Sequence, residues 1–338
     1  MDVSTLIWGL TLAVVVLLLA VDFLGHARKV HAPSLREAAW WSLGYVIVAL
    51  LFGGFVWLQW GQEFGVQYFS GYITEKSLSV DNLFVFVLIF ASFKVPREYQ
   101  QKILLIGIAI ALVLRSLFIF VGAAAIARFS SVFYLFGAFL IYTAYTQVRG
   151  KQEEEYQENR LLRLTRRILP TTEDYVGDKL TTRMQGRRYI TPLLIVVFAI
   201  GSADVMFAVD SIPAIFGLTQ EPFLVFVANA FSLLGLLQLY FLIDGLLDKL
   251  VYLHYGLAAI LAFIGAKLVI HALHINTLGV INGGRPWLAI PEPGTFVSLA
   301  VIVGILAVTT VASLTIGRRR AEFSRGEAEE PAEEAPGR

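Results

Sequence analysis

Apolar residues are concentrated in nine long runs along the chain, and polar residues fall mostly in the segments between them. A helix needs about 20 apolar residues to cross the hydrocarbon core of a bilayer, and windows of about 19 residues detect such helices. The pattern therefore predicts an all-α polytopic membrane protein with about nine transmembrane helices. These helices are expected at residues 4–25, 38–60, 66–91, 103–122, 131–148, 192–217, 223–247, 250–273 and 295–316.

The composition agrees with a chain that lives in lipid. Of its 338 residues, 57% are hydrophobic and 16% are charged, and the mean hydropathy is +0.69, which is far more apolar than an average water-soluble domain. We therefore expect one transmembrane domain over residues 1–316. The remaining segment, 317–338, is rich in Glu, Ala and Pro and has little to bury, so we expect it to be a disordered cytoplasmic tail.

Basic residues fall almost entirely in alternate connecting segments. Those segments hold 22 Lys and Arg residues, ten of them from Arg149 to Arg188, whereas the other connecting segments hold only Arg128 and Arg285. Lys and Arg are enriched in cytoplasmic loops. The N-terminus is therefore expected outside and the C-terminus in the cytoplasm of a prokaryotic plasma membrane, with 149–191 as a cytoplasmic connector.

Several functional classes are disfavoured by what the chain contains. The formal net charge is +1 and the basic residues do not form one patch, so no nucleic-acid partner is expected beside the lipid bilayer. The sequence has no cysteine, so any metal site must use oxygen or imidazole ligands. No nucleotide-binding loop of the form G-x-x-x-x-G-K-[ST] is present, and no nucleophile clusters with a base. We therefore expect neither an enzyme nor a resident cofactor.

Two acidic motifs repeat along the chain. One reads EKSLSVDN from Glu75 to Asn82, and the other reads DVMFAVDS from Asp204 to Ser211. In both, an acid is followed six residues later by Asp and then by a small polar residue. The two predicted spans run in opposite directions. Residues of about 66–148 and 192–273 are therefore expected to form two inverted three-helix repeats, an arrangement that places a transport site near the bilayer midplane.

The acids of the two motifs need compensation inside a membrane. A carboxylate at the centre of a span costs roughly 2.5–3.5 kcal/mol on insertion scales, so a bound ion, a proton or a counter-charge is required. Carboxylate, amide and hydroxyl oxygens are the ligands that hard divalent cations prefer. The expected metal ligands are Glu75, Asp81, Asn82, Asp204, Asp210 and Ser211, with Ser79 as a further neutral oxygen.

Helical geometry leaves two arrangements of these acids open. Residues six apart on a helix lie about 240° apart, so Glu75 and Asp81 do not share a face, whereas Glu75 and Asn82 do. All four acids meet only if the helices unwind locally. Asp81 and Asp210 are expected to act as one unit, because an inverted repeat brings equivalent residues together about its pseudo-two-fold axis. Otherwise one acid of each pair binds metal while the other carries protons or forms an ion pair.

A purely structural interpretation is also open. In it, Asp81, Asp210, Arg115, Asp244 and Lys267 neutralise one another as ion pairs inside the bundle. Arg115 considered alone is expected to be a structural counter-charge, because it would repel a cation unless an acid intervened.

Three segments resemble a known family of membrane proteins. The segments EKSLSVDNLFVF, ADVMFAVDSIPA and ANAFSLLGLLQLYFLIDGLLDKLVYL are similar to the TerC/Alx family, and the resemblance covers roughly residues 4–275. It implies manganese export, tellurium resistance and a relation to the lysine-exporter group. Leu237 departs from the family pattern, because an Arg is usual there. The ion pathway implied by the resemblance consists of Glu75, Asp81, Asn82, Asp204, Asp210 and Ser211, with Asp22, Arg115 and Asn229 as secondary members.

These observations predict a secondary transporter that exports a divalent cation, with Mn²⁺ as the expected transported substrate. Two other functions stay open. One is a membrane scaffold that aids metalation or insertion of secreted and membrane proteins, which would dock on 149–191. The other is a tellurite-resistance component without transport.

The orientation can be tested on this cysteine-free background. A single cysteine placed at Gln157 should be inaccessible to an impermeant thiol reagent in intact cells, because the basic connector is expected in the cytoplasm. A cysteine at Asp2 should be labelled in the same cells. Strong labelling at position 157 would contradict both the orientation and the inverted repeats.

Overall fold

The computed structural model describes residues 1–26, 34–129, 131–149, 171–172, 175–184, 187–243, 252–278 and 280–329. Within these residues, each of the nine predicted runs is mostly helical. The helices are α1 (Thr5–His26), α2 (Leu35–Trp60), α3 (Gln62–Ser92), α4 (Arg97–Arg128), α5 (Val132–Arg149), α7 (Pro192–Phe216), α8 (Pro222–Leu233), α9 (Leu236–Ile243), α10 (Leu253–His274) and α11 (Thr295–Glu329). The all-α polytopic fold class is confirmed.

Local sequence signals explain where several helices begin. The Ser34 hydroxyl accepts a hydrogen bond of 3.2 Å from the Glu37 backbone N–H and so caps the start of α2. Pro192 and Pro222 stand at the first positions of α7 and α8, where proline has a suitable φ and its missing N–H is not needed.

Not every helix meets the length and hydropathy expected of a membrane span. Six described helices do so, namely α1, α2, α4, α7, α10 and α11, and the bent pair α8–α9 would make a seventh. The helix α3 carries Glu75, Lys76 and Asp81 within its apolar run. A count of nine crossings and the inverted repeats therefore stay predictions.

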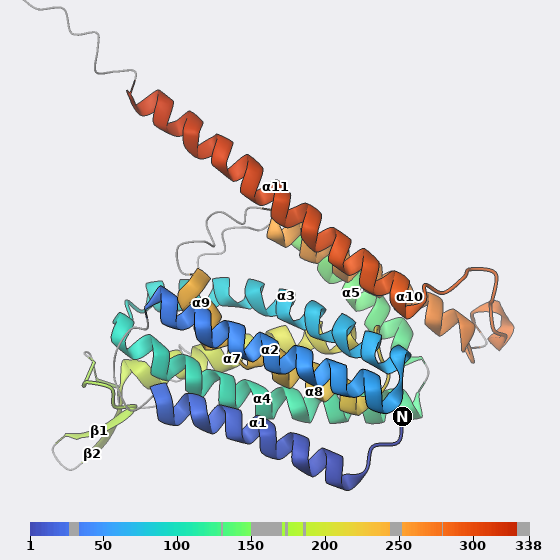
Figure 1. Ribbon diagram of the computed structural model, residues 1–338, viewed down its shortest axis with the longest axis horizontal. Helices are drawn as coiled ribbons and strands as arrows, with labels where there is room; N and C mark the ends of the chain where they lie inside the picture. Colours follow the sequence, from blue (N-terminus) through green and yellow to red (C-terminus); the bar gives the residue numbers. More distant parts are fainter. Residues whose placement is uncertain are drawn as a thin grey trace, which may run out of the picture.

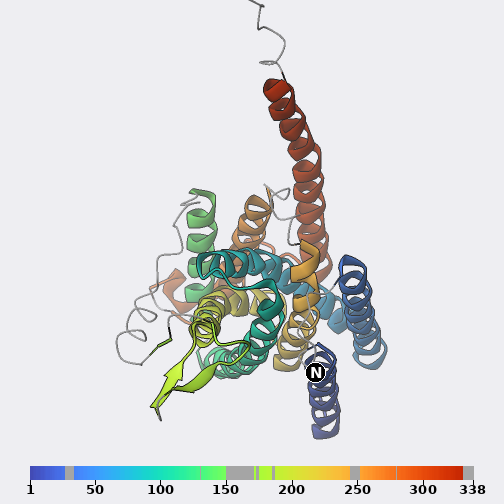
Figure 2. The same cartoon turned by 90° about the vertical axis from the view of Figure 1, so that its left-hand side faces the viewer.

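The helices form an elongated bundle. Figure 1 shows α1, α2, α3, α4, α7 and α8 running along its length, with the β1–β2 hairpin at one end and the N-terminus at the other. The helix α11 runs beside α10 and projects beyond the bundle, which is also clear in the view from the end (Figure 2). Within the bundle, α3 packs against α8, α4 against α7, and α5 against α10.

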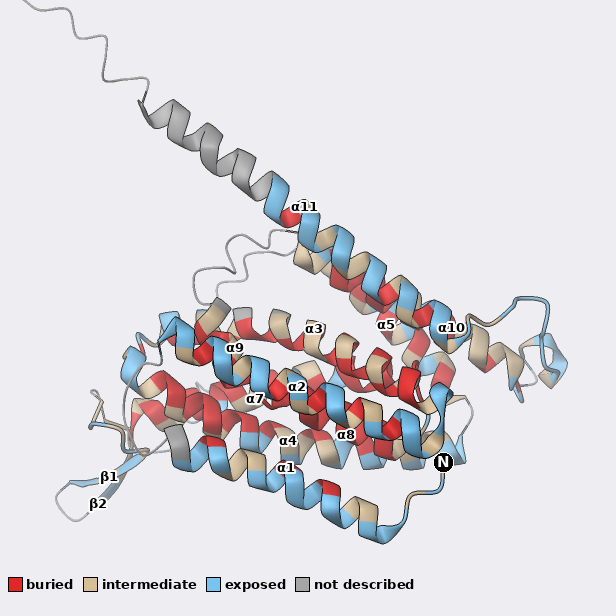
Figure 3. Ribbon diagram, viewed as in Figure 1, coloured by how far each residue is buried: buried red, intermediate tan, exposed pale blue. Residues whose placement is uncertain are grey.

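Burial separates a central pair of helices from the periphery. Every residue of α8 after its first is buried, and so is most of α7 (Figure 3). By contrast, α2 exposes Leu58 at 88% and α11 exposes Val308 at 69%. Apolar side chains on these outer faces are suited to contact with lipid. The buried polar residues Asp204 and Ser211 of α7 and Asn229 and Ser232 of α8 are therefore placed away from lipid, at the centre of the protein.

The packing is consistent with the predicted repeats. The predicted repeats pair α3 with α7, α4 with α8–α9, and α5 with α10. A pseudo-two-fold axis that relates these helices would convert the α3–α8 contact into the α7–α4 contact. Both contacts are observed. Individual positions follow the same exchange. A Cβ added to Gly71 would lie 3.3 Å from Ala228, and one added to Gly107 would lie 2.8 Å from Ile200, the residue 129 positions after Gly71.

The predicted run at 223–247 is not one continuous helix. The helix α8 ends at Leu233, and α9 begins at Leu236 after a bend of 40°. Gly235, at the break, has a φ of +78°, a conformation that glycine adopts without a Cβ clash. Hydropathy could not reveal this break, because the residues on both sides of it are apolar. Asp244 lies outside the described residues.

The connector 149–191 is described only in its second part. There, β1 (Thr181–Met184) and β2 (Arg187–Ile190) form an antiparallel hairpin. The segment before it is attached to the bundle, since the Tyr175 hydroxyl donates to the Phe93 carbonyl at 2.6 Å and Lys102 Nζ lies 2.8 Å from Asp178 Oδ2. The Lys102 ammonium lowers the pKa of the Asp178 carboxyl. The mixture of acids, Leu and Arg from Glu153 to Arg167 predicts a surface helix, and this segment lies outside the described residues.

The C-terminal helix is longer than expected. We expected disorder from residue 317, but α11 continues to Glu329. Ala, Glu and Arg, which are frequent in 317–329, have high helix propensity. Residues 330–338 lie outside the described part of the chain, so disorder there stays a prediction.

The close approach of α5 and α10 at Gly137 and Gly265 predicts a local sensitivity to side-chain size. A Cβ at Gly137 of α5 would lie 2.8 Å from the Gly265 carbonyl oxygen of α10, and a Cβ at Gly265 would lie 2.9 Å from the Gly137 carbonyl oxygen. Gly265→Val should therefore destabilise the protein by about 1–3 kcal/mol through overpacking. Thermal unfolding in detergent would measure this. Gly54→Ala is the control, because nothing lies within 4 Å of that position, and an equal loss in both variants would contradict the prediction.

Candidate functional site

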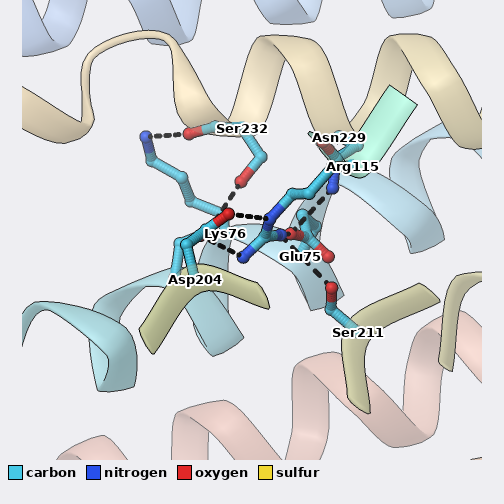
Figure 4. A network of polar contacts seen from close by, with 8 residues as sticks. Glu75, Lys76, Arg115, Asp204, Ser211, Asn229 and Ser232 are labelled. Atoms are coloured by element: carbon cyan, nitrogen blue, oxygen red, sulfur yellow. Dashed lines mark hydrogen bonds and ion pairs between the residues drawn. The ribbon is translucent and has the colours of Figure 1, made fainter. Parts of the chain in front are cut away.

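A fully buried arginine connects the two acidic motifs. Arg115, on α4, lies between α3 and α7 with its guanidinium facing both helices (Figure 4). Its Nη1 donates to Glu75 Oε1 and, at 3.2 Å, to Ser211 Oγ. Its Nη2 and Nε donate to the two carboxylate oxygens of Asp204 at 3.1 and 3.3 Å. Arg115 therefore binds the first acid of each motif.

Two amide side chains complete this network. Asn229 of α8 donates from Nδ2 to Glu75 Oε1 at 3.0 Å. The Asn82 amide, oriented to suit its neighbours, accepts from Arg115 Nη2 at 3.3 Å and donates to the Leu78 carbonyl at 3.1 Å. Glu75, Asp204, Ser211, Asn82 and Asn229 are all buried. The network thus joins four helices, α3, α4, α7 and α8.

The spacing of the motifs explains which residues meet. Glu75 and Asn82 are seven apart, as are Asp204 and Ser211, and seven residues is close to two helical turns. Both α3 and α7 are continuous through these positions. Each motif therefore presents its first and last residues on one face, and no local unwinding brings all four acids together.

Of the second acids of the two motifs, Asp81 and Asp210, only Asp210 has a described side chain, and it is not part of this network. Asp210 is half-buried on α7 and accepts a hydrogen bond of 3.3 Å from Thr143 of α5. Asp81 lies in α3, but its side chain is outside the described part of the chain. The expectation that Asp81 and Asp210 form one unit receives no support from the position of Asp210.

Other expected residues lie apart or at the margin of the network. Asp22 of α1 is buried and accepts from Gln238 Nε2 of α9 at 2.9 Å. Ser79 lies 3.3 Å from the Ser232 hydroxyl at the end of α8. Lys267 donates to Ser298 at 3.2 Å rather than to an acid of the motifs. The proposed ion pairing of Arg115 is present, but its partners are Glu75 and Asp204.

Lys76 lies next to Glu75 in α3 and is not among the predicted site residues. Its Nζ donates to the carbonyls of Ser232 and Leu234 at 3.0 and 3.4 Å, at the break between α8 and α9 (Figure 4). The last carbonyls of a helix have no partner within it, and in lipid such groups must be satisfied inside the protein. The signal was present in the sequence, because an ionisable residue inside an apolar run is unusual.

The network leaves binding capacity unused. The carboxylates of Glu75 and Asp204 carry two formal negative charges, and Arg115 carries one positive charge. Glu75 Oε2 is buried without a hydrogen-bond partner, and so is the neighbouring Thr74 hydroxyl. Buried polar atoms are normally paired, so this oxygen is available to a proton or a cation. Among the described residues, no three His, Asp or Glu side chains already form a metal site.

A polar cavity lies at the end of the bundle where α3 begins and α7 ends. Its volume is about 360 Å³, and it is lined by Glu63, Gln67, Glu221, Lys267, His271 and Glu292, among others. The Met1 amino group binds Glu221 at 3.0 Å, so the N-terminus is at this end. Gln67 precedes Glu75 by eight residues, or about 12 Å along the helix axis. The cavity and the Arg115 network therefore lie along the same helices.

Comparison with known proteins identifies relatives over most of the chain. An uncharacterized membrane protein of Mycobacterium tuberculosis is 51% identical over 327 residues, which cover 95% of this chain and 82% of that protein. One from Myxococcus xanthus is 41% identical over 313 residues, covering 92% of this chain and 93% of the relative. A protein of Escherichia coli K12 named "Putative membrane-bound redox modulator Alx" is 39% identical over 294 residues, covering 83% and 92%. No solved structure matches the chain.

The family assignment follows from a match to a family model. The model described as "Integral membrane protein TerC family" matches residues 60–321, which contain both acidic motifs, Arg115 and Asn229. The resemblance seen in the sequence motifs is thereby confirmed. With this match over most of its length and these relatives, the chain belongs to the TerC family of integral membrane proteins.

Proposed function

We propose that this protein is a secondary transporter that exports a divalent metal cation, with Mn²⁺ as the expected substrate. The observation that carries the proposal is the buried network in which Glu75 and Asp204, from two different helices, face one guanidinium and one carboxylate oxygen remains unpaired. Ionisable groups inside a membrane protein are costly and are typical of ion pathways.

The chemistry of the network suits a hard divalent ion. The carboxylates of Glu75 and Asp204 supply charged oxygens, and Asn82 and Ser211 supply neutral oxygens beside them. Mg²⁺, Ca²⁺ and Mn²⁺ prefer such ligands. The polar cavity at the N-terminal end of α3 would be the external opening if the N-terminus is outside, as the distribution of basic residues predicts.

The name of the Escherichia coli relatives points to redox modulation. The sequence printed here has no cysteine, so thiol–disulfide exchange within it is not available as a mechanism. Transport of a redox-active metal such as Mn²⁺ would give a membrane protein an indirect influence on redox state. The proposal therefore accommodates this name without a second function.

Reconstitution of the purified protein tests the proposal. Sealed vesicles containing the protein and a trapped Mn²⁺ indicator should show Mn²⁺ flux well above protein-free vesicles, because transport needs no other protein component. Competition by Mg²⁺, Ca²⁺, Zn²⁺ and Fe²⁺ would then rank the ions. If correctly inserted protein gives no flux of any of these ions, the protein is not a transporter of this kind, and a scaffold role is favoured.

The two network carboxylates are predicted to serve one ion. Glu75→Gln and Asp204→Asn should each lower Mn²⁺ flux by about tenfold or more, since a hydrogen bond to a charged group contributes about 1.5–3 kcal/mol. The double variant should lose less than the sum of the two single losses in free energy. Asp178→Asn is a matched neutralisation outside the membrane-spanning segments and should keep wild-type flux.

Membrane abundance must be measured for each variant, because removing one partner of a buried ion pair destabilises a protein. Near-wild-type flux in either single variant at normal abundance would contradict the shared site. Strictly additive losses would contradict it as well.

A further inference from the structure

The guanidinium of Arg115 is hydrogen-bonded to most of the carboxylate oxygens that a cation would bind. It binds Glu75 Oε1 and both carboxylate oxygens of Asp204, so only Glu75 Oε2 of the four carboxylate oxygens is left unpaired. Its Nη1 also donates to Ser211 and its Nη2 to Asn82. A divalent ion that binds both carboxylates therefore competes with the guanidinium for the same oxygens, above all for those of Asp204.

The charges of the network favour such an exchange. With Arg115 in contact, the two carboxylates and the guanidinium sum to one negative charge. Adding a divalent ion beside the guanidinium would give one positive charge in a fully buried place. An ion that takes the place of the guanidinium neutralises the carboxylates, and the guanidinium must then move to other acceptors. Two cations at one buried site repel each other strongly, so the ion and Arg115 are alternatives.

The neighbouring lysine is not available for this role. Lys76 Nζ is bonded to the carbonyls of Ser232 and Leu234 at the break after α8, and Figure 4 shows it directed toward that helix. None of its hydrogen bonds is to Glu75 or Asp204. Arg115 is therefore the cation of the network that can alternate with the cargo.

We infer that Arg115 is a tethered counter-cation, which releases the carboxylates when the cargo ion binds and neutralises them again after the cargo has left. The inference rests on the proposed transport function. It assigns Arg115 to the step in which the transporter returns without cargo. Two bare carboxylates inside the protein would oppose that return because an uncompensated buried charge is strongly unfavourable. Arg115 thereby permits net transport rather than obligatory exchange of one ion for another.

Net transport and exchange can be measured separately in the same vesicles. Net flux is Mn²⁺ uptake into vesicles that contain no Mn²⁺, and exchange is uptake of radioactive Mn²⁺ into vesicles loaded with unlabelled Mn²⁺. Exchange needs only loaded carriers, whereas net flux needs an unloaded return. In Arg115→Gln, the ratio of net flux to exchange should fall about 100-fold, because the return leaves the carboxylates without a counter-charge.

The same variant should reach half-maximal exchange at a lower Mn²⁺ concentration than the wild type, because the competing cation is gone. Arg115→Lys keeps the charge and should keep the wild-type ratio, even if both rates fall with the loss of the planar guanidinium. Arg128→Gln is the matched control, since it makes the same change on α4 at an exposed position near the end of the helix. It should alter neither rate.

The outcomes separate this inference from the function on which it rests. Equal loss of net flux and exchange in Arg115→Gln and Arg115→Lys would show a structural role only and would overturn the inference while transport itself stands. Unchanged net flux in Arg115→Gln would also overturn it. No Mn²⁺ flux of either kind in the wild type would overturn the proposed function and the inference together.

Discussion

The ion pairing of Arg115 with Glu75 and Asp204 is the interaction on which the centre of the protein depends. It places three ionised groups in a fully buried position, where each alone would be strongly unfavourable. The three groups come from α4, α3 and α7, so these helices cannot separate or rotate independently without exposing a charge to an apolar environment. Buried amide and hydroxyl groups then complete the bonds that the charges leave open. The position of these helices is in this way tied to one polar network.

Much of the architecture could be predicted because it depends on local sequence. Runs of apolar residues of membrane-spanning length predicted the positions of the described helices of the bundle, apart from the division of one run into α8 and α9. The seven-residue spacing of Glu75 and Asn82 predicted that these two residues share a face of α3. The break after α8 could not be predicted from hydropathy, since only Gly235 distinguishes that place from its apolar surroundings. The Glu, Ala and Pro content of the C-terminal segment is typical of disorder, but residues 317–329 also have high helix propensity and continue α11.

The acids that pair with Arg115 could not be predicted from the sequence for a different reason. Asp81 and Asp210 occupy equivalent positions of the two motifs, and so do Glu75 and Asp204. The repeat alone therefore does not indicate which of these acids pair with Arg115. The choice is made by helix packing. The faces of α3 and α7 that touch α4 carry Glu75 and Asp204, while Asp210 points toward Thr143 of α5. Contacts between helices far apart in the chain decide such pairings, and periodicity contains no information about them.

The residual charge of the network also makes it sensitive to an electric field. Its three ionised groups sum to one formal negative charge and lie on helices that run the length of the bundle. One elementary charge that crosses a potential of 100 mV changes the free energy by about 2.3 kcal/mol. Any rearrangement that moves these helices relative to the bilayer would therefore perform electrical work. The membrane voltage would then help to set which arrangement is populated, even with no ligand bound.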